Sequence, residues 1–82
     1  MHLSDRLKAA RNDRGLGQAQ AARELGVARS AYRLWEMGVA LPELRRWKGV
    51  ATWLGVSVTT LLLAEGLLED DDPLASVDGS VG

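Results

Sequence analysis

A single glycine separates two helix-length amphipathic stretches in the middle of this chain, and that spacing limits how the segment can fold. The segment QAQAARELGVARSAYRLWEM covers residues 18–37, with Gly26 between its two halves. Two helices that cross steeply over so short a turn need a small residue at the crossing, and Ala22 is one. The turn needs a residue that adopts a left-handed backbone at little cost, which Gly26 can do. The segment therefore predicts two short helices packed at a steep angle.

Helical patterns also fill most of the remaining chain. The expected helices cover about residues 5–14, 18–25, 28–37, 42–54 and 58–68, with Gly66 as an alternative, earlier end of the last one. Their starts are expected at the caps Ser4, Gly17 and Ser57 and at Pro42 in a first turn, and their ends at Gly15, Gly26, Gly38 and Gly55. The apolar face of the fourth helix is expected to hold Leu44, Trp47, Val50, Ala51 and Leu54. Five short helices with tight turns indicate an all-α domain.

Charge divides the chain into two unequal parts. Residues 1–56 contain all ten lysines and arginines with five acids, a net charge of +5, whereas residues 57–82 contain six acids and no base, a net charge of −6. We expect a domain over residues 1–68 and an acidic, disordered tail over residues 69–82. One hypothesis is that the tail competes with phosphates for the basic face, and the alternative is that it only keeps the chain in solution.

The composition offers little support for catalysis, metal binding or membrane insertion. The chain has no cysteine, and its one histidine is residue 2. The acids at residues 70–72 are adjacent and lack the spacing of a calcium loop. The longest apolar run, Leu61 to Ala64, is too short to cross a bilayer, and no signal peptide is evident. We therefore expect a cytoplasmic protein that is not an enzyme and has no cofactor.

Three segments together resemble the lambda-repressor-like, Cro/CI-type helix-turn-helix family, also called XRE. They are RLKAARNDRGLGQ, ELGVARSAYRLWEMG and LGVSVTTLL, within about residues 4–63. The resemblance implies a compact five-helix DNA-binding domain whose helix-turn-helix is formed by helices 2 and 3. It also implies a homodimer on a two-fold site in double-stranded DNA, with helix 3 in the major groove.

Helical periodicity divides helix 3 into two faces. At about 100° per residue, one broad side is expected to hold Val27, Ala28, Ala31, Tyr32, Leu34 and Trp35. The other side holds Arg29, Ser30, Arg33, Glu36 and Met37. Within the family pattern Arg29, Ser30 and Arg33 are the expected base readers, and because arginine pairs bidentately with guanine we expect a guanine in each half-site.

The resemblance also assigns roles to residues outside that cationic arc. Gln18 matches a glutamine that braces a phosphate or supports a reading side chain in the family. Glu36 matches an acid that pairs with an arginine of helix 1, here Arg11, and the pair is expected to orient helix 3. The loop after helix 3 is often basic in relatives, but here residues 38–44 contain no base. The bases that follow are expected to contact phosphates in its place: Arg45, Arg46 and Lys48.

Trp53 lies away from the middle of the apolar face of helix 4. It is either covered by the tail or by helix 5, or it contacts another chain. The residues that we expect at such a protein interface are Leu41, Trp53, Leu63, Leu67 and Leu68.

Two functions from different classes fit these features. The first is a sequence-specific DNA-binding transcriptional regulator, expected to be a repressor and to be associated with the nucleoid, although the sequence does not decide between repressor, activator and antitoxin. The second is a protein-interaction module of the same fold, such as an antitoxin or regulatory partner, with weak or no DNA binding. The apolar 38–44 loop, Trp53 and the acidic tail favour the second function, and the cationic arc of helix 3 favours the first.

Overall fold

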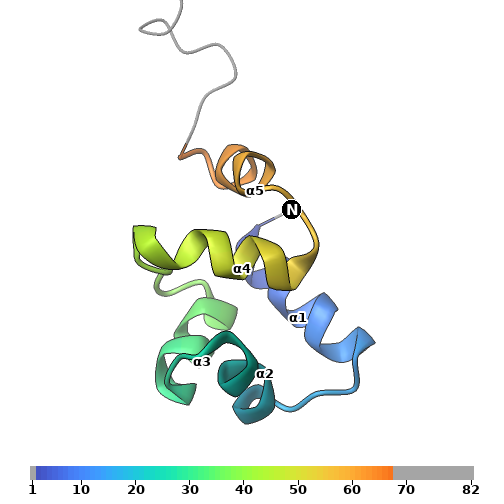
Figure 1. Ribbon diagram of the computed structural model, residues 1–82. Coiled ribbons are helices and arrows are strands. Elements are labelled where there is room, and N and C mark those ends of the chain that lie inside the picture. The colour runs from blue at the N-terminus through green and yellow to red at the C-terminus, as the bar shows by residue number, and fades with distance from the viewer. Residues whose placement is uncertain (1, 68–82) are drawn as a thin grey trace, which may run out of the picture.

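Short connections join the helices of this chain in the computed structural model, which describes residues 2–67 (Figure 1). Within these residues the structure contains five α-helices, one 3-10 helix and no strand. The elements are α1 (Leu3–Asp13), α2 (Gln18–Leu25), α3 (Arg29–Met37), η1 (Leu44–Arg46), α4 (Trp47–Leu54) and α5 (Val58–Ala64). The all-α fold predicted from the sequence is confirmed. The predicted tail, residues 69–82, lies outside the described part of the chain.

The helix-turn-helix segment forms as its glycine predicts. Gly26 ends α2 with φ 73° and ψ 31°, a left-handed conformation that costs glycine little. The next N–H group, that of Val27, donates to the Ala22 carbonyl at 2.9 Å and so satisfies one of the free carbonyls at the end of α2. Only residues 26–28 separate α2 from α3, so the two helices pack closely.

Helix α4 runs through the middle of the molecule, with α2 and α3 on one side and α5 on the other (Figure 1). Helix α1 packs against both α3 and α4. The buried core contains Leu3, Leu7, Ala21, Ala22, Tyr32, Trp35, Trp47, Val50, Ala51 and Leu61. Burying each of the larger side chains contributes roughly 1.5–3 kcal/mol. The core therefore draws on every α-helix and fixes α3 against the rest of the domain.

Helix α1 begins two residues earlier than predicted, so the assignment of Ser4 as its cap was wrong. His2 holds the cap position, and its carbonyl accepts from the N–H groups of Asp5 and Arg6 at 3.1 and 3.0 Å. The Leu3 N–H donates to the side chain of Glu65, which follows α5. The local pattern could not predict this early start, because Glu65 lies 62 residues away.

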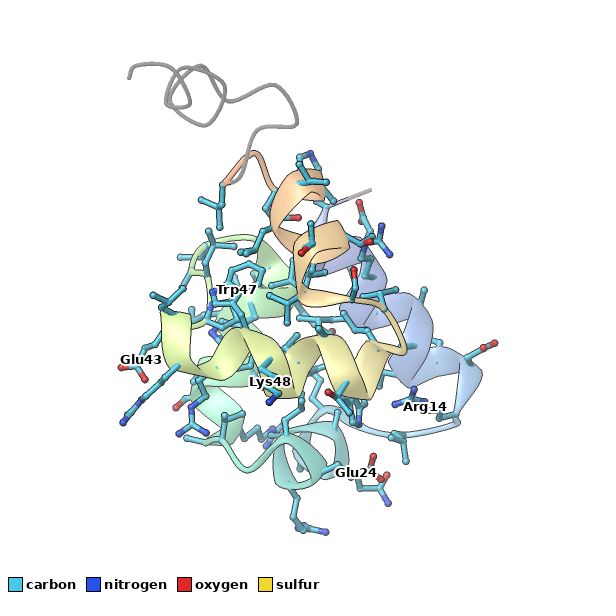
Figure 2. The ribbon with its side chains drawn as sticks, turned by 45° about the horizontal axis from the view of Figure 1, so that its top comes forward. Arg14, Glu24, Glu43, Trp47 and Lys48 are labelled. Carbon is cyan, nitrogen blue, oxygen red and sulfur yellow. The ribbon has the colours of Figure 1, made fainter. Side chains whose placement is uncertain are left out.

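The start of the fourth helix was also predicted wrongly. Pro42 lies before η1, and α4 begins only at Trp47. The buried Trp47 indole donates from Nε1 to the Pro42 carbonyl at 2.8 Å, which holds the preceding chain outside the helix. As a result, Leu44 is 81% exposed and does not join the apolar face on which it was placed. Figure 2 shows Trp47 on the inner side of α4.

The start of α5 was predicted correctly, and its end agrees with the alternative, earlier break at Gly66 and not with Leu68. The Ser57 hydroxyl accepts from the Thr60 N–H at 3.0 Å, which confirms this side chain as the cap. The helix ends at Ala64, before the expected end at Leu68, and Gly66 then adopts φ 73° in the following turn. The Leu67 N–H donates to the Leu62 carbonyl at 2.9 Å and closes that turn.

Candidate nucleic-acid interface

The burial of one side of α3 determines which of its side chains are exposed on the surface. Tyr32 is fully buried, and the exposed fractions of Trp35 and Glu36 are 6% and 5%. The rings of Tyr32 and Trp35 lie edge to face, with centroids 6.3 Å apart. Because these residues hold one side of α3 in the core, Arg29, Ser30 and Arg33 lie on the opposite side and are exposed.

The three predicted base readers lie together on the surface. Arg29, Ser30 and Arg33 line one shallow depression, together with Leu34. Within residues 2–67 no acid forms an ion pair with either arginine. Both guanidinium groups are therefore open to an anionic or hydrogen-bonding partner. The assignment of Leu34 and Ala28 to the packed side of the helix was wrong, because Leu34 is 37% exposed and Ala28 is exposed. The assignment of Glu36 to the outer side was also wrong, because Glu36 is buried.

A buried polar network fixes α3 relative to α1 and α2. Arg11 donates to Glu36 from Nε to Oε2 at 2.6 Å and from Nη2 to Oε1 at 3.1 Å, so the two residues expected to pair form a bidentate contact. Gln18 Nε2 donates to Glu36 Oε1 at 3.0 Å, and the Tyr32 hydroxyl donates to Oε2. Arg11 Nη1 also reaches the Leu16 carbonyl at 3.1 Å. One carboxylate thus joins three helices.

The hydrogen bonds of this network keep the Glu36 carboxylate ionised. Burial by itself raises the pKa of Glu36, but the donors Arg11, Tyr32 and Gln18 outweigh burial and hold that pKa below its usual value. Burial, followed by the hydrogen bond to Glu36, raises the pKa of Tyr32, so its hydroxyl remains a donor. The hydrogen bond to Glu36 raises the pKa of Arg11 in spite of partial burial. The network therefore contains one acid and one base, both charged.

The side chain of Gln18 bonds to Glu36, which is not one of the predicted base readers. It is the first residue of α2 and is partly buried, and its amide nitrogen is committed to Glu36. The Gly17 N–H is taken by Gln20 Oε1 at 2.9 Å. The geometry gives Gln18 a supporting contact with α3, and a phosphate contact by the same side chain remains a proposal.

The three bases predicted to contact phosphates lie on η1 and at the start of α4. Arg46 Nη1 donates to the Gly26 carbonyl at 3.3 Å, so this arginine reaches the turn of the helix-turn-helix. Arg45 is exposed and pairs with Glu43, with 3.2 Å between Nη2 and Oε1. Lys48 is exposed on α4, and Glu43 projects from the chain just before η1 (Figure 2). Arg45 and Arg46 line one cleft together with Val27, which places them beside the turn between α2 and α3.

The residues expected at a protein interface do not form one surface of similar exposure. Leu41 and Leu67 are 48% and 53% exposed, Leu63 is partly buried, and Leu68 lies outside the described residues. Trp53 is partly buried and contacts Arg14 and Glu24 of the same chain, and the tail that was expected to cover it lies outside the described residues. Most of the exposed large apolar side chains lie between residues 34 and 44: Leu34, Met37, Val39, Leu41 and Leu44.

The sequence interpretation missed Leu34, Arg14 and Glu24. Leu34 lies between the outward Arg33 and the buried Trp35. A helical wheel centred on Tyr32 places Leu34 on the opposite, exposed side of α3. The contacts of Arg14 and Glu24 with Trp53 join residues 39 and 29 positions apart, and no local pattern indicates them.

Other kinds of site find no support among the described residues. Within residues 2–67 no group of three or more histidine, cysteine, aspartate or glutamate side chains is placed to hold a metal ion. In the same residues no single helix is long and apolar enough to cross a membrane. Leu44–Leu54 and Val58–Ala64 pass that test of length and composition only as a pair bent by 106°.

Comparison with known proteins gives the same assignment for most of the chain. A family model described as helix-turn-helix matches residues 7–61. The chain is 31% identical over 68 residues to the HTH-type transcriptional activator BcrR of Enterococcus faecalis, covering 83% of this chain and 33% of that protein. It is 38% identical over 60 residues to the SPbeta prophage-derived uncharacterized HTH-type transcriptional regulator YonR of Bacillus subtilis (strain 168), covering 73% of this chain and 56% of that protein. This chain therefore spans about a third and about half of these two relatives.

Proposed function

This chain belongs to the XRE-type helix-turn-helix family of DNA-binding transcriptional regulators, and from that premise we propose that it is a sequence-specific repressor. In this proposal α3 lies in the major groove of DNA. One observation carries it: α3 is fixed in the core by Trp35 and the Glu36 network while its outer face presents two arginines that form no ion pair in residues 2–67. A rigid helix with a cationic outer face suits the groove.

Arg29 and Arg33 are the proposed readers of guanine. They lie four residues apart and therefore one above the other on α3, about 6 Å apart along its axis at 1.5 Å per residue. Each guanidinium group can donate to O6 and N7 of one guanine. Ser30, in the same depression, is proposed to donate to a base or a phosphate. Each half-site is accordingly expected to contain at least one guanine.

Phosphate contacts are proposed on both sides of the recognition helix. Gln18 and the start of α2 form one side, and Arg45, Arg46 and Lys48 form the other. The support is the contact of Arg46 with the turn at Gly26, which brings η1 next to α3. Because each neutralised phosphate releases counterions, removing one of these bases is expected to reduce the slope of log K against log salt by about 1.

A homodimer on a two-fold site is the proposed assembly, acting in the cytoplasm on nucleoid DNA. The proposed protein contacts lie outside the reading depression and are the exposed Leu41 and Leu67 and the partly buried Leu63. Since one relative is named an activator, the sign of regulation needs its own measurement: a reporter gene under the bound promoter. Repression by the wild-type chain is expected, and activation would contradict that part of the proposal.

The central experiment is selection of binding sites from random duplex DNA at low salt, followed by affinity measurements on the enriched site. The double variant Arg29→Ala/Arg33→Ala is expected to lose at least about 30-fold in affinity, which corresponds to about 1 kcal/mol for each lost bidentate contact. The matched control, Lys8→Ala/Arg23→Ala, removes the same charge from exposed positions of α1 and α2. A smaller loss for the control is expected, and equal losses would contradict base reading by α3.

The second candidate function is a protein-interaction module with weak or no DNA binding. The observation that favours it is the group of exposed apolar side chains between residues 37 and 44, namely Met37, Val39, Leu41 and Leu44. If no DNA sequence is enriched at low salt, the first proposal fails. The second then predicts that Leu41→Ser, tested by pull-down from the native host, loses a partner that the wild-type chain retains.

A further inference from the structure

Leu34 is an apolar side chain within a depression whose other walls are Arg29, Ser30 and Arg33. It is 37% exposed, whereas the next residue, Trp35, is 6% exposed. A leucine in this position contributes little to the core. It instead gives the cationic depression an apolar wall, which a purely electrostatic contact with phosphates does not need.

The backbone around Leu34 keeps this side chain on the outside. The Leu34 carbonyl accepts from the N–H groups of Val39 at 3.0 Å and Ala40 at 3.4 Å, and it also accepts from the cap residue Gly38. These bonds fix the last turn of α3. Because Trp35 is held in the core from the same turn, Leu34 cannot turn inward unless the helix itself moves.

The order of residues on the outer face forms two parallel rows. Arg29 and Arg33 lie one helical turn apart, and Ser30 and Leu34 lie one turn apart beside them. One turn rises about 5.4 Å, which is between one and two base-pair steps of about 3.4 Å. The base atoms contacted by the Arg29–Arg33 row and those contacted by the Ser30–Leu34 row therefore lie on the same or neighbouring base pairs.

Leucine forms no hydrogen bond through its side chain, so it cannot read the polar edge of a base. The C5-methyl group of thymine is the apolar feature that the major groove presents. We infer that Leu34 is a fourth specificity-determining residue, and that it packs on a thymine methyl group within about two base pairs of the guanine read by an arginine. This inference rests on the proposed function and names part of the site that it recognises.

The charges around Leu34 favour DNA over a protein partner in this depression. Two guanidinium groups flank the leucine, and in residues 2–67 neither forms an ion pair. A duplex supplies both the anionic phosphates and base acceptors for the arginines and the methyl group for the leucine. A protein ligand needs acids and an apolar side chain in the same arrangement.

The test replaces each thymine of the selected site, one at a time, with deoxyuridine, which removes the methyl group and leaves the hydrogen-bonding edge intact. With the wild-type chain, one replacement per half-site is expected to weaken binding roughly fourfold, the equivalent of about 0.8 kcal/mol for a buried methyl-sized group. With Leu34→Ala, the same replacement is expected to have no effect, while the other positions behave as in the wild type.

The matched control is Leu44→Ala, which removes the same side chain from an exposed position outside the depression and should retain the wild-type deoxyuridine profile. A second variant, Leu34→Gln, is expected to shift selection at this position from thymine towards adenine, because glutamine pairs with adenine N6 and N7. If Leu34→Ala keeps the wild-type profile, or no thymine shows the effect, the inference is wrong although DNA binding stands. Failure to enrich any sequence would instead overturn the proposed function.

Discussion

The guanidinium group of Arg14 lies over the indole ring of Trp53, 4.3 Å from the ring centroid. The same arginine donates from Nη2 to the Trp53 carbonyl at 2.5 Å. On its other side, Trp53 donates from Nε1 to Glu24 Oε1 at 2.9 Å. Figure 2 shows Arg14 at the end of α1 and Glu24 on α2. Trp53 of α4 thus ties three helices together within one chain.

Loss of this contact should destabilise the domain without a change in its core. Arg14→Ala is expected to lower the free energy of unfolding by about 1–2 kcal/mol, from a cation–π contact of about 0.5–1 kcal/mol and a hydrogen bond of about 1 kcal/mol. Urea unfolding followed by circular dichroism measures the change. Arg23→Ala, an exposed arginine of α2, is the control. Equal destabilisation by both variants would show that the contact with Trp53 contributes nothing.

Low pH should destabilise the domain by protonating Glu36. Because the pKa of Glu36 is lower in the folded chain than its ordinary value of 4.5, the folded carboxylate binds fewer protons than the unfolded one. The stability it contributes is therefore fully present well above pH 4.5 and is lost as the pH falls through the lower folded pKa. Unfolding free energies measured from pH 7 to pH 3 should show a loss below about pH 4.5.

Two variants separate Glu36 from the other carboxylates. The free energy of unfolding of Glu36→Gln should be about 3 kcal/mol lower at pH 7, because Arg11 loses its charged partner. Below about pH 4.5, where the wild type loses stability, the stability of this variant should fall less steeply with pH; this part of the curve is called the acid limb. Tyr32→Phe removes one donor that lowers the pKa of Glu36, so its acid limb should be intermediate. An acid limb in Glu36→Gln as steep as that of the wild type would assign the effect to other groups.

Local features of the sequence were sufficient to predict the helix-turn-helix. The bounds of α2, its end at Gly26 and the cap at Ser57 follow from residues a few positions apart, and each was predicted correctly. The family assignment rests on the same short-range pattern. The pairing of Arg11 with Glu36 came from the family resemblance, because nothing within either helix indicates it.

The remaining errors come from contacts between distant parts of the chain. The Trp47 indole donates to the Pro42 carbonyl because other helices bury the indole. As a result, α4 begins later than predicted. Glu65 binds the Leu3 N–H across 62 residues and so affects the start of α1. Periodicity alone did not determine whether Leu34 lies inside or outside the buried face of α3. The burial of Tyr32 and Trp35 places Leu34 outside that face.

Two glycine-to-alanine variants should change stability in opposite directions. At Gly26 an added Cβ meets no atom within 4 Å, but φ is +73°, so Gly26→Ala is expected to cost about 1–2 kcal/mol from backbone strain alone. Gly49 lies inside α4, where an added Cβ also meets no atom within 4 Å. Gly49→Ala is expected to gain about 0.5–1 kcal/mol from helix propensity. Thermal unfolding measures both, and the same sign for both changes would refute the backbone argument.

The N-terminus of α3 lacks the hydroxyl cap that α5 has. Ala28 precedes α3 with φ −68° and ψ 144°, close to Ser57 before α5 with φ −76° and ψ 153°. In α5 the Ser57 hydroxyl accepts from the N–H three residues on, at 3.0 Å. A serine at position 28 is therefore expected to accept from the Ala31 N–H in the same way. Since Ala28 is exposed, Ala28→Ser needs no repacking and should gain about 1 kcal/mol.

The reciprocal change, Ser57→Ala, should lose about the same amount, because it removes the corresponding bond from α5. Urea unfolding of both single variants and of the double variant tests the two caps together. The two caps share no contact partner, so their effects should add within about 0.5 kcal/mol. If Ala28→Ser leaves stability unchanged while Ser57→Ala lowers it, the similar backbone angles do not suffice for capping, and the free N–H groups of α3 are satisfied by water.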